Sequence, residues 1–172
     1  MKVIKIEIIK WPFLLLLVMA NLSGLAQAND KKDQQKEYKY QELKNLIESQ
    51  QYTFEATRAN PGKGRQIDMT TRNNYLTIQQ NNAIARMPYF GRAYSGGYGA
   101  ASGGIEFDGP MLAYEIRFND KKKRVNISFR AKSKNETYTC SLSLSSIENV
   151  TLTISSFNRQ SISYFGAIRP VK

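Results

Sequence analysis

The sequence predicts an α+β domain in which one N-terminal amphipathic helix packs on an antiparallel meander of about eight strands. Three observations support this fold class. Apolar residues recur at three- and four-residue spacing between Glu37 and Gln51. Most of the chain after that segment alternates apolar and polar residues, and short polar stretches separate the alternating runs. Such alternation fits an open sandwich and a flattened barrel equally well, so we expect a curled sheet of one of these two kinds.

The predicted helix has one apolar face, as expected of a helix that lies on a hydrophobic core. Its opposite face is polar or charged and should meet solvent. The apolar positions are Tyr40, Leu43, Leu46 and Ile47, and the polar positions are Glu42, Lys44, Asn45 and Glu48.

The first half of the predicted sheet lies between the helix and Phe118. The segment Asn60 to Gly64 consists of turn residues, since proline fixes φ and glycine accepts positive φ. Asn81 and Asn82 fit a two-residue hairpin turn. The strands predicted around these turns are Tyr52 to Arg58, Tyr75 to Gln80, Ala83 to Met87, Gly104 to Gly109 and Leu112 to Phe118.

The last third of the chain has the clearest alternation, which is typical of strands with one buried and one solvated face. Cys140 is the single cysteine and falls on an apolar side, so we expect a small core residue and not a reactive thiol. The apolar sides carry Val125, Ile127, Phe129 and Ala131, then Tyr138, Cys140, Leu142 and Leu144, then Val150, Leu152 and Ile154, and finally Ile162, Tyr164 and Ile168.

The first 28 residues have the three-part layout of a secretory signal peptide. A basic start precedes the short apolar run Trp11 to Ala20, and the small residues Ala26 to Ala28 follow it. An uncleaved membrane anchor is the alternative, but the apolar run is shorter than the ~20 residues that span a bilayer. We therefore expect cleavage near Ala28, no transmembrane span in the mature chain, and a periplasmic or secreted location.

Cleavage at that point divides the chain into three parts. Residues 1–28 are the signal peptide, and the wholly polar residues 29–37 form a flexible leader. Residues 38–172 then form a single α+β domain, which is long enough to bury a core of its own.

The chain is strongly basic, with 25 Lys and Arg against 14 Asp and Glu and a net charge of +11. Strongly basic proteins often bind nucleic acid, but export makes that partner unexpected here. We expect instead an envelope component, which is an anionic lipid, a glycan or a protein.

The residue types that are absent exclude several chemistries. The chain has no histidine, which rules out Ser-His-Asp and Cys-His nucleophile systems and imidazole metal sites. We expect no cofactor and no metal. The best remaining catalytic pair is Glu106 and Asp108, which lie two apart on a predicted strand and so about 7 Å apart on one face, as in inverting glycosidases. An exposed pair at the end of a strand explains the same two residues, and we expect no enzymatic activity.

Glycine and aromatic residues are concentrated between Met87 and Phe107. A phosphate-binding loop would lead into a helix, whereas these glycines lead into a predicted strand. Two interpretations remain. In one, the Tyr-Phe-Gly sequences at Tyr89 to Gly91 and Tyr164 to Gly166 mark kinks at sheet corners, where glycine allows a bulge or a close backbone approach. In the other, an open rim faces a ligand through Tyr89, Arg92, Tyr94 and Tyr98.

Four stretches of the sequence stand out together: "YTFEATRANPGKGRQI", "NYLTIQ", "MPYFGRAYSGGYGAASGGIEFDG" and "SISYFGAI". They resemble the exported bacterial family described as domain of unknown function 4251, and "PYFGRAY" is the most specific part. The resemblance spans the region from Leu43 to Ile168. It implies a periplasmic or outer-envelope protein of Gram-negative bacteria of the Bacteroides group, and it carries no catalytic residue or cofactor over to this chain.

These observations together favour an exported, non-enzymatic envelope protein that works as a ligand- or partner-binding module. A structural or assembly protein of the envelope is the alternative. A hydrolase that uses Glu106 and Asp108 ranks last.

Overall fold

The computed structural model describes residues 31–62, 65–70, 74–94, 103–134 and 136–171 of the chain. The chain forms two units, Met1–Tyr38 and Lys39–Lys172. The expected signal peptide lies outside the described residues. The expected leader is helical from residue 31 on, and its flexibility stays a prediction. The described helical residues include no segment long and apolar enough to cross a membrane.

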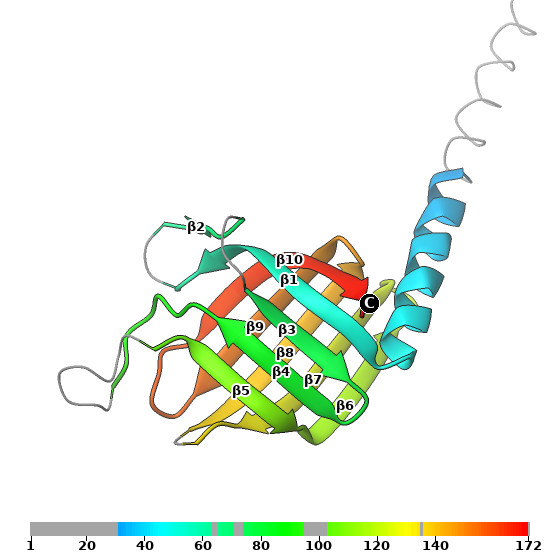
Figure 1. Ribbon diagram of the computed structural model, residues 1–172. Coiled ribbons are helices and arrows are strands. Elements are labelled where there is room, and N and C mark those ends of the chain that lie inside the picture. The colour runs from blue at the N-terminus through cyan, green and yellow to red at the C-terminus, as the bar shows by residue number, and fades with distance from the viewer. Residues whose placement is uncertain (1–30, 63–64, 71–73, 95–102, 135, 172) are drawn as a thin grey trace, which may run out of the picture. The chain divides into compact units, whose positions relative to one another are not determined.

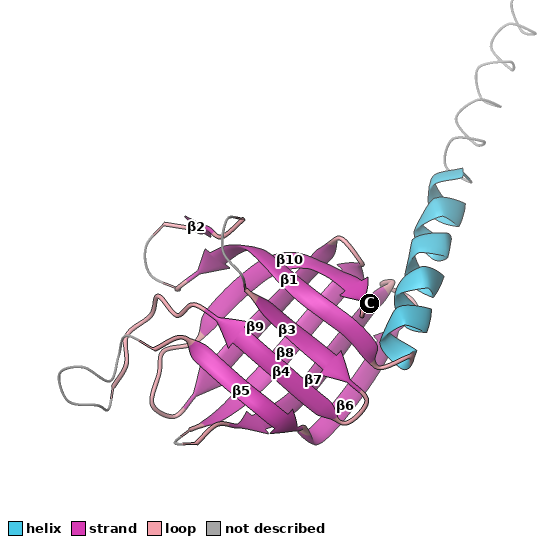
Figure 2. Cartoon of the chain, viewed as in Figure 1, coloured by secondary structure: helices cyan, strands magenta, loops and turns pink. Residues whose placement is uncertain are grey.

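The second unit consists almost wholly of antiparallel strands, together with the helical residues 39–48 (Figure 2). Its described residues form ten strands where the sequence predicted about eight. A two-residue strand, β2, is too short to show any alternation and was not expected. The strands are β1 (Gln51–Asn60), β2 (Ile67–Asp68), β3 (Tyr75–Gln79), β4 (Asn82–Met87), β5 (Ile105–Pro110), β6 (Leu112–Asn119), β7 (Arg124–Lys132), β8 (Thr137–Ser146), β9 (Asn149–Ser156) and β10 (Ile162–Pro170).

The strands form one curled sheet in the order β5-β4-β3-β1-β10-β9-β8-β7-β6, with β2 paired to β1. Figure 1 shows β1, β3, β4 and β5 crossing in front of β6 to β9, so the sheet folds back on itself. Its two edge strands, β5 and β6, are joined through the single buried residue Met111. The sheet is therefore nearly closed and barrel-shaped, which decides between the two predicted forms.

A glycine allows the sharp bend where β1 pairs with β10. The pairing register shifts between Ala56 and Arg58, next to the position where Ala56 faces Gly166. A Cβ atom at Gly166 would lie 1.9 Å from the main-chain oxygen of Glu55, which is far inside contact distance. The prediction that the second Tyr-Phe-Gly sequence marks a bulge and a close backbone approach is confirmed.

The interior of the sheet forms one continuous hydrophobic core. Alternating residues of β7, β8 and β9 are buried, including Phe129, Leu142 and Leu152, as predicted. Cys140 is fully buried, and burial raises the pKa of its thiol. The core runs on to the helix, which contributes the buried side chains of Tyr40, Leu43 and Ile47.

Polar contacts hold the helix to the turn between β6 and β7. The Tyr40 hydroxyl donates to Asp120 Oδ1 at 2.9 Å, and Lys44 Nζ lies 3.3 Å from the same oxygen. These two donors hold the pKa of Asp120 below its usual range, the Tyr40 hydrogen bond first. The Lys44 ammonium also lies 5.1 Å from the centre of the Phe118 ring.

Candidate functional site: an aromatic rim and an adjacent groove

Two loops meet at the end of the sheet that lies away from the β6–β7 turn. One loop, residues 88–94, follows β4, and the other, residues 157–161, joins β9 to β10. The Tyr94 amide donates to Asn158 O at 2.8 Å, and the Gln160 amide donates to Arg92 O at 2.9 Å. These bonds flank an isolated bridge at Arg159, so the loops are paired in the manner of two short strands.

The hydroxyl groups of two tyrosines hold these loops through hydrogen bonds to main-chain oxygens. The half-buried Tyr89 hydroxyl donates toward the main-chain oxygens of Arg92, at 2.8 Å, and Gln160, at 2.9 Å. The buried Tyr164 hydroxyl donates to Pro88 O at 2.8 Å. Burial raises the pKa of both hydroxyls, so both keep their protons for these bonds. Both Tyr-Phe-Gly sequences thus supply a tyrosine that supports the loops.

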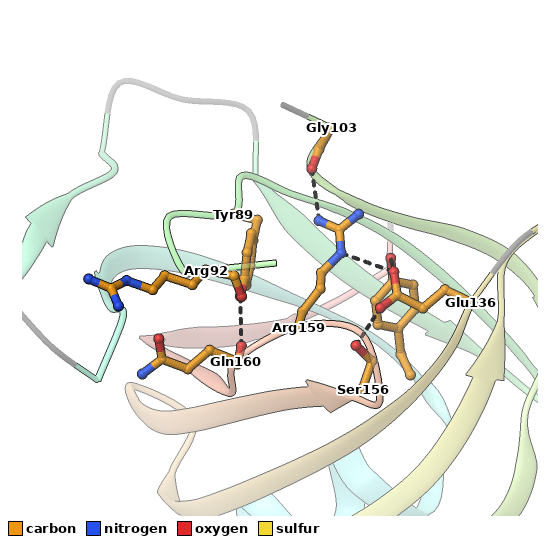
Figure 3. A network of polar contacts seen from close by, with 8 residues as sticks. Tyr89, Arg92, Gly103, Glu136, Ser156, Arg159 and Gln160 are labelled. Atoms are coloured by element: carbon orange, nitrogen blue, oxygen red, sulfur yellow. Dashed lines mark hydrogen bonds and ion pairs between the residues drawn. The ribbon is translucent and has the colours of Figure 1, made fainter. Parts of the chain in front are cut away.

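Arg159 connects the loops to the neighbouring part of the sheet (Figure 3). Its Nε lies 2.9 Å from Glu136 Oε2, and the two side chains are only 14% and 10% exposed. Its Nη1 donates to Gly103 O at 2.9 Å. Its guanidinium lies 5.1 Å from the centre of the Tyr89 ring, within the range of a cation–π contact.

Glu136 accepts two further hydrogen bonds, from the Tyr138 hydroxyl at 2.8 Å and from the Ser156 hydroxyl. Burial on its own would raise the pKa of Glu136. The hydrogen bonds from Ser156 and Tyr138 and the charge of Arg159 outweigh burial and hold the pKa below its usual range. The carboxylate is therefore charged and well satisfied, as a residue that fixes Arg159 in place should be.

The fastened loops project large side chains into solvent. Tyr94 is 69% exposed and Phe157 is 97% exposed. Arg92 is exposed as well, and its guanidinium points away from the Arg159–Glu136 pair (Figure 3). We call Arg92, Tyr94 and Phe157 the aromatic rim.

The aromatic rim contains two of the four residues predicted from the sequence. Tyr94 and Arg92 reach solvent, whereas Tyr89 lies beneath them and supports their loop. Tyr98 lies outside the described residues. Phe157 was missed, and the only signal for it is a large apolar residue within the polar stretch "SSFNR" between two predicted strands.

A groove of about 840 Å³ lies beside the rim, between the edge strand β5 and the turn from β7 to β8. Phe107 and Tyr138 are buried beneath it with their ring centres 5.8 Å apart, so the groove has a closed floor. Carboxylates and basic side chains both line its walls. The charged lining residues are Arg86, Glu106, Asp108, Lys132, Lys134, Glu136 and Arg159.

The predicted carboxylate pair lies in this groove. Glu106 and Asp108 share the exposed face of β5, and Phe107 between them is buried, as the alternation predicted. Arg159 and Tyr138 line the same groove, whereas Arg92 does not. Within the described part of the chain, neither Glu106 nor Asp108 has a hydrogen-bond or ion-pair partner. The two carboxylates can accept hydrogen bonds from a ligand.

A smaller hollow of about 520 Å³ lies on the outer side of β1 and β3 and is lined mainly by threonines. The buried Asn74 lines it and donates through Nδ2 to Ala56 O, while its Oδ1 has no partner among the residues that the structure describes. Among the described residues, no group of three or more Cys, Asp or Glu side chains is arranged to hold a metal ion.

Comparison with known proteins agrees with this architecture. No match is found among the curated proteins. A crystal structure of a DUF4251 family protein from Bacteroides eggerthii DSM 20697 is similar to this chain with a TM-score of 0.59 and 22% sequence identity. The similarity covers 77% of this chain and 88% of that one, and it concerns the fold. The family described as "Domain of unknown function (DUF4251)" matches residues 34–168. The chain therefore belongs to the DUF4251 family.

Proposed function

We propose that this protein is a non-enzymatic binding module of the cell envelope and that the aromatic rim is its contact surface. The observation that carries the proposal is the exposure of Phe157, at 97%, beside Tyr94, at 69%, on loops that hydrogen bonds hold in one arrangement. Burying a phenylalanine contributes about 1.5–3 kcal/mol. Phe157 is not buried in the folded chain, so this free energy becomes available when a partner covers its side chain.

The composition and rigidity of the rim support this role. Aromatic residues and arginine are enriched at the centres of protein interfaces, and they account for most of the binding energy there. The loops are already ordered by their pairing and by the Tyr89 and Tyr164 hydroxyls. Binding through ordered loops costs less conformational entropy than binding through loops that must first be fixed.

The leader supports the location. A basic start, a short apolar run and small residues before position 29 are typical of a chain that is exported and cleaved. We therefore propose a periplasmic or secreted mature protein whose partner is an envelope component. Residues 1–28 contain three lysines and one glutamate, so the mature chain keeps a net charge of +9, which favours a partner surface that is acidic.

The test compares the wild type with the double variant Tyr94→Ser/Phe157→Ser. Each protein is crosslinked in the native envelope and recovered, and mass spectrometry identifies what is crosslinked to it. The control Tyr38→Ser removes another exposed tyrosine, which is 72% exposed on the helix. We expect one component that the wild type and the control retain and the double variant loses. Equal recovery with the double variant would exclude the rim as the contact surface.

An assembly role is the second candidate, because β6 is an edge strand of the sheet with exposed apolar residues. Leu112 is 37% exposed and Phe118 is 36% exposed. Edge strands offer main-chain hydrogen bonds to another chain. This role predicts that Leu112→Lys releases the protein from a large envelope complex during size-exclusion chromatography, whereas the rim variant leaves that complex intact.

A further inference from the structure

We propose that the groove between β5 and the β7–β8 turn binds an acidic saccharide, which is a hydroxyl-rich sugar that carries a carboxylate or a phosphate. This site is separate from the aromatic rim, and the inference does not depend on the rim being a contact surface. Three features of the groove carry it: a fixed arginine, carboxylates and basic side chains that line the same groove, and a closed floor.

The fixed arginine supplies a directed site for an anion. Arg159 donates to Glu136 through Nε and to Gly103 through Nη1, and among the described residues these are its hydrogen-bond acceptors. Within the described part of the chain, the second terminal nitrogen, Nη2, makes no hydrogen bond. A guanidinium has five N–H donors in a planar array. Arg159 therefore keeps donors for a carboxylate or phosphate while its orientation is already set.

Lys132 and Lys134 extend this basic side of the groove. Both are exposed and line the same groove as the carboxylates of β5: Lys132 is the last residue of β7, and Lys134 lies in the turn to β8. Exposed lysines are mobile point charges that attract an anion without fixing its orientation. The lysines draw an anionic group toward the groove, and Arg159 orients it.

The carboxylates of β5 require a ligand that also donates hydrogen bonds, although Arg86 lies across from Glu106 in the pairing of β4 with β5. Glu106 and Asp108 lie on one face of β5, about 7 Å apart by strand geometry. An ionised carboxylate only accepts hydrogen bonds, so both would repel a simple anion. Sugar hydroxyls are donors spaced along a ring, and they can meet both carboxylates while an acidic substituent reaches Arg159. A ligand with hydroxyls and one negative charge satisfies both the carboxylates and the basic side chains of the groove.

The dimensions of the groove favour a ligand that lies along the surface. Its volume of about 840 Å³ falls within the range of about 300–1,000 Å³ that is usual for small-ligand sites. The packed rings of Phe107 and Tyr138 close the floor, so a ligand does not enter the core. A peptide strand inserted between β5 and β7 would need two strand spacings, or about 9.6 Å. The Cα atoms of β5 and β7 approach within 8 Å, which leaves no room for a strand there.

Titration calorimetry of the mature protein with four probes tests the chemistry. Trigalacturonic acid carries carboxylates, glucose 1-phosphate carries a phosphate, maltotriose is neutral, and hexaglutamate is acidic without hydroxyls. We expect binding of one or both acidic sugars, at least about tenfold tighter than either of the other probes at low salt. The two acidic sugars distinguish a uronate polysaccharide from a phosphorylated sugar headgroup. Equal binding of maltotriose or of hexaglutamate, or no binding of either acidic sugar, would overturn the proposal.

Two double variants, each lacking two lysines, test whether the sugar binds at the groove. Lys132→Gln/Lys134→Gln should weaken binding of the acidic sugar about fivefold to tenfold. The control Lys121→Gln/Lys122→Gln removes the same charge at the other end of β7 and should change binding less than twofold. Equal effects of the two pairs would show that only the overall charge of the protein matters and would overturn the site.

Neutralising the two carboxylates of β5 gives opposite changes in affinity under the two explanations. If Glu106 and Asp108 accept hydrogen bonds from sugar hydroxyls, Glu106→Gln/Asp108→Asn weakens binding. If the groove is only an electrostatic trap, the same change removes repulsion and strengthens binding, and the saccharide proposal fails. The rim variant Tyr94→Ser/Phe157→Ser should leave the calorimetry unchanged, so the rim and the groove can fail independently. Thermal unfolding of each variant confirms that the fold persists.

Discussion

Replacing Glu136 by glutamine should lower the free energy of unfolding by about 1–2 kcal/mol at pH 7. The carboxylate accepts hydrogen bonds from Arg159 at 2.9 Å, from Tyr138 at 2.8 Å and from Ser156. A hydrogen bond to a charged group contributes about 1.5–3 kcal/mol, and a neutral one about 0.5–1.5 kcal/mol. The amide has the same shape and keeps one acceptor oxygen, so part of the network survives. The loss is therefore smaller than the ~3–5 kcal/mol that follows when one partner of a fully buried pair is removed.

The difference in unfolding free energy between the wild type and the glutamine variant should fall at acid pH. The pKa of Glu136 in the folded state lies below its unfolded value, which is about 4.3. Its stabilising contribution is present above about pH 4.3 and is lost as the pH falls through the folded-state pKa. Glutamine does not titrate, so the difference between the wild type and the variant should stay constant near neutrality and shrink in acid.

Urea unfolding followed by circular dichroism at several pH values measures this difference. Glu115→Gln is the matched control, because Glu115 also pairs with an arginine, Arg117, at 2.7 Å, but these side chains are 51% and 74% exposed. Exposed pairs contribute little, so the control should cost less than about 0.5 kcal/mol. A loss at Glu136 no larger than the control's, or one that does not change down to pH 3, would refute the assignment of Glu136 as the charged anchor of Arg159.

Two further predictions concern the core. Gly166→Ala should destabilise the domain severely, because its Cβ would lie 1.9 Å from Glu55 O. The control Gly103→Ala should be nearly neutral, because no atom of the described residues lies within 4 Å of the position of its Cβ. Similar midpoints in thermal unfolding for the two variants would contradict the close approach at Gly166. The thiol of Cys140 should not react with a disulfide reagent at pH 8 in the folded protein, because it is buried and its pKa is raised. It should react at once in 6 M guanidinium, which unfolds the protein. A fast reaction without denaturant would contradict its burial.

Alternation in the sequence predicted the strands and their buried faces well, because it reports a local property. A residue such as Phe129 or Leu152 is buried when its strand lies on a core, and the period of two shows this without knowledge of the neighbouring strands. The helical spacing of Tyr40, Leu43 and Ile47 predicted the buried face of the helix in the same way.

The candidate site could be predicted only in part. Tyr94 and Arg92 were expected to be exposed because they lie in a glycine-rich loop, which is a local signal. Phe157 has no such signal, because phenylalanine is among the residue types that are most often buried, and nothing near it in the sequence indicates exposure. The support of the loop by the Tyr89 hydroxyl depends on Gln160, which is 71 positions away in the sequence.

The sequence by itself determined the fold class, the identity of most core residues and the expectation of an exported chain, because composition and periodicity record whether each residue meets water or a core. Only the tertiary structure decided that the sheet nearly closes and that Glu136 meets Arg159 beside the carboxylates of β5. The physical reason is that contacts between distant loops depend on how far the whole sheet curls. That curl is the summed result of twist, the bulge at Gly166 and the corner at Met111, and no short stretch of sequence records it.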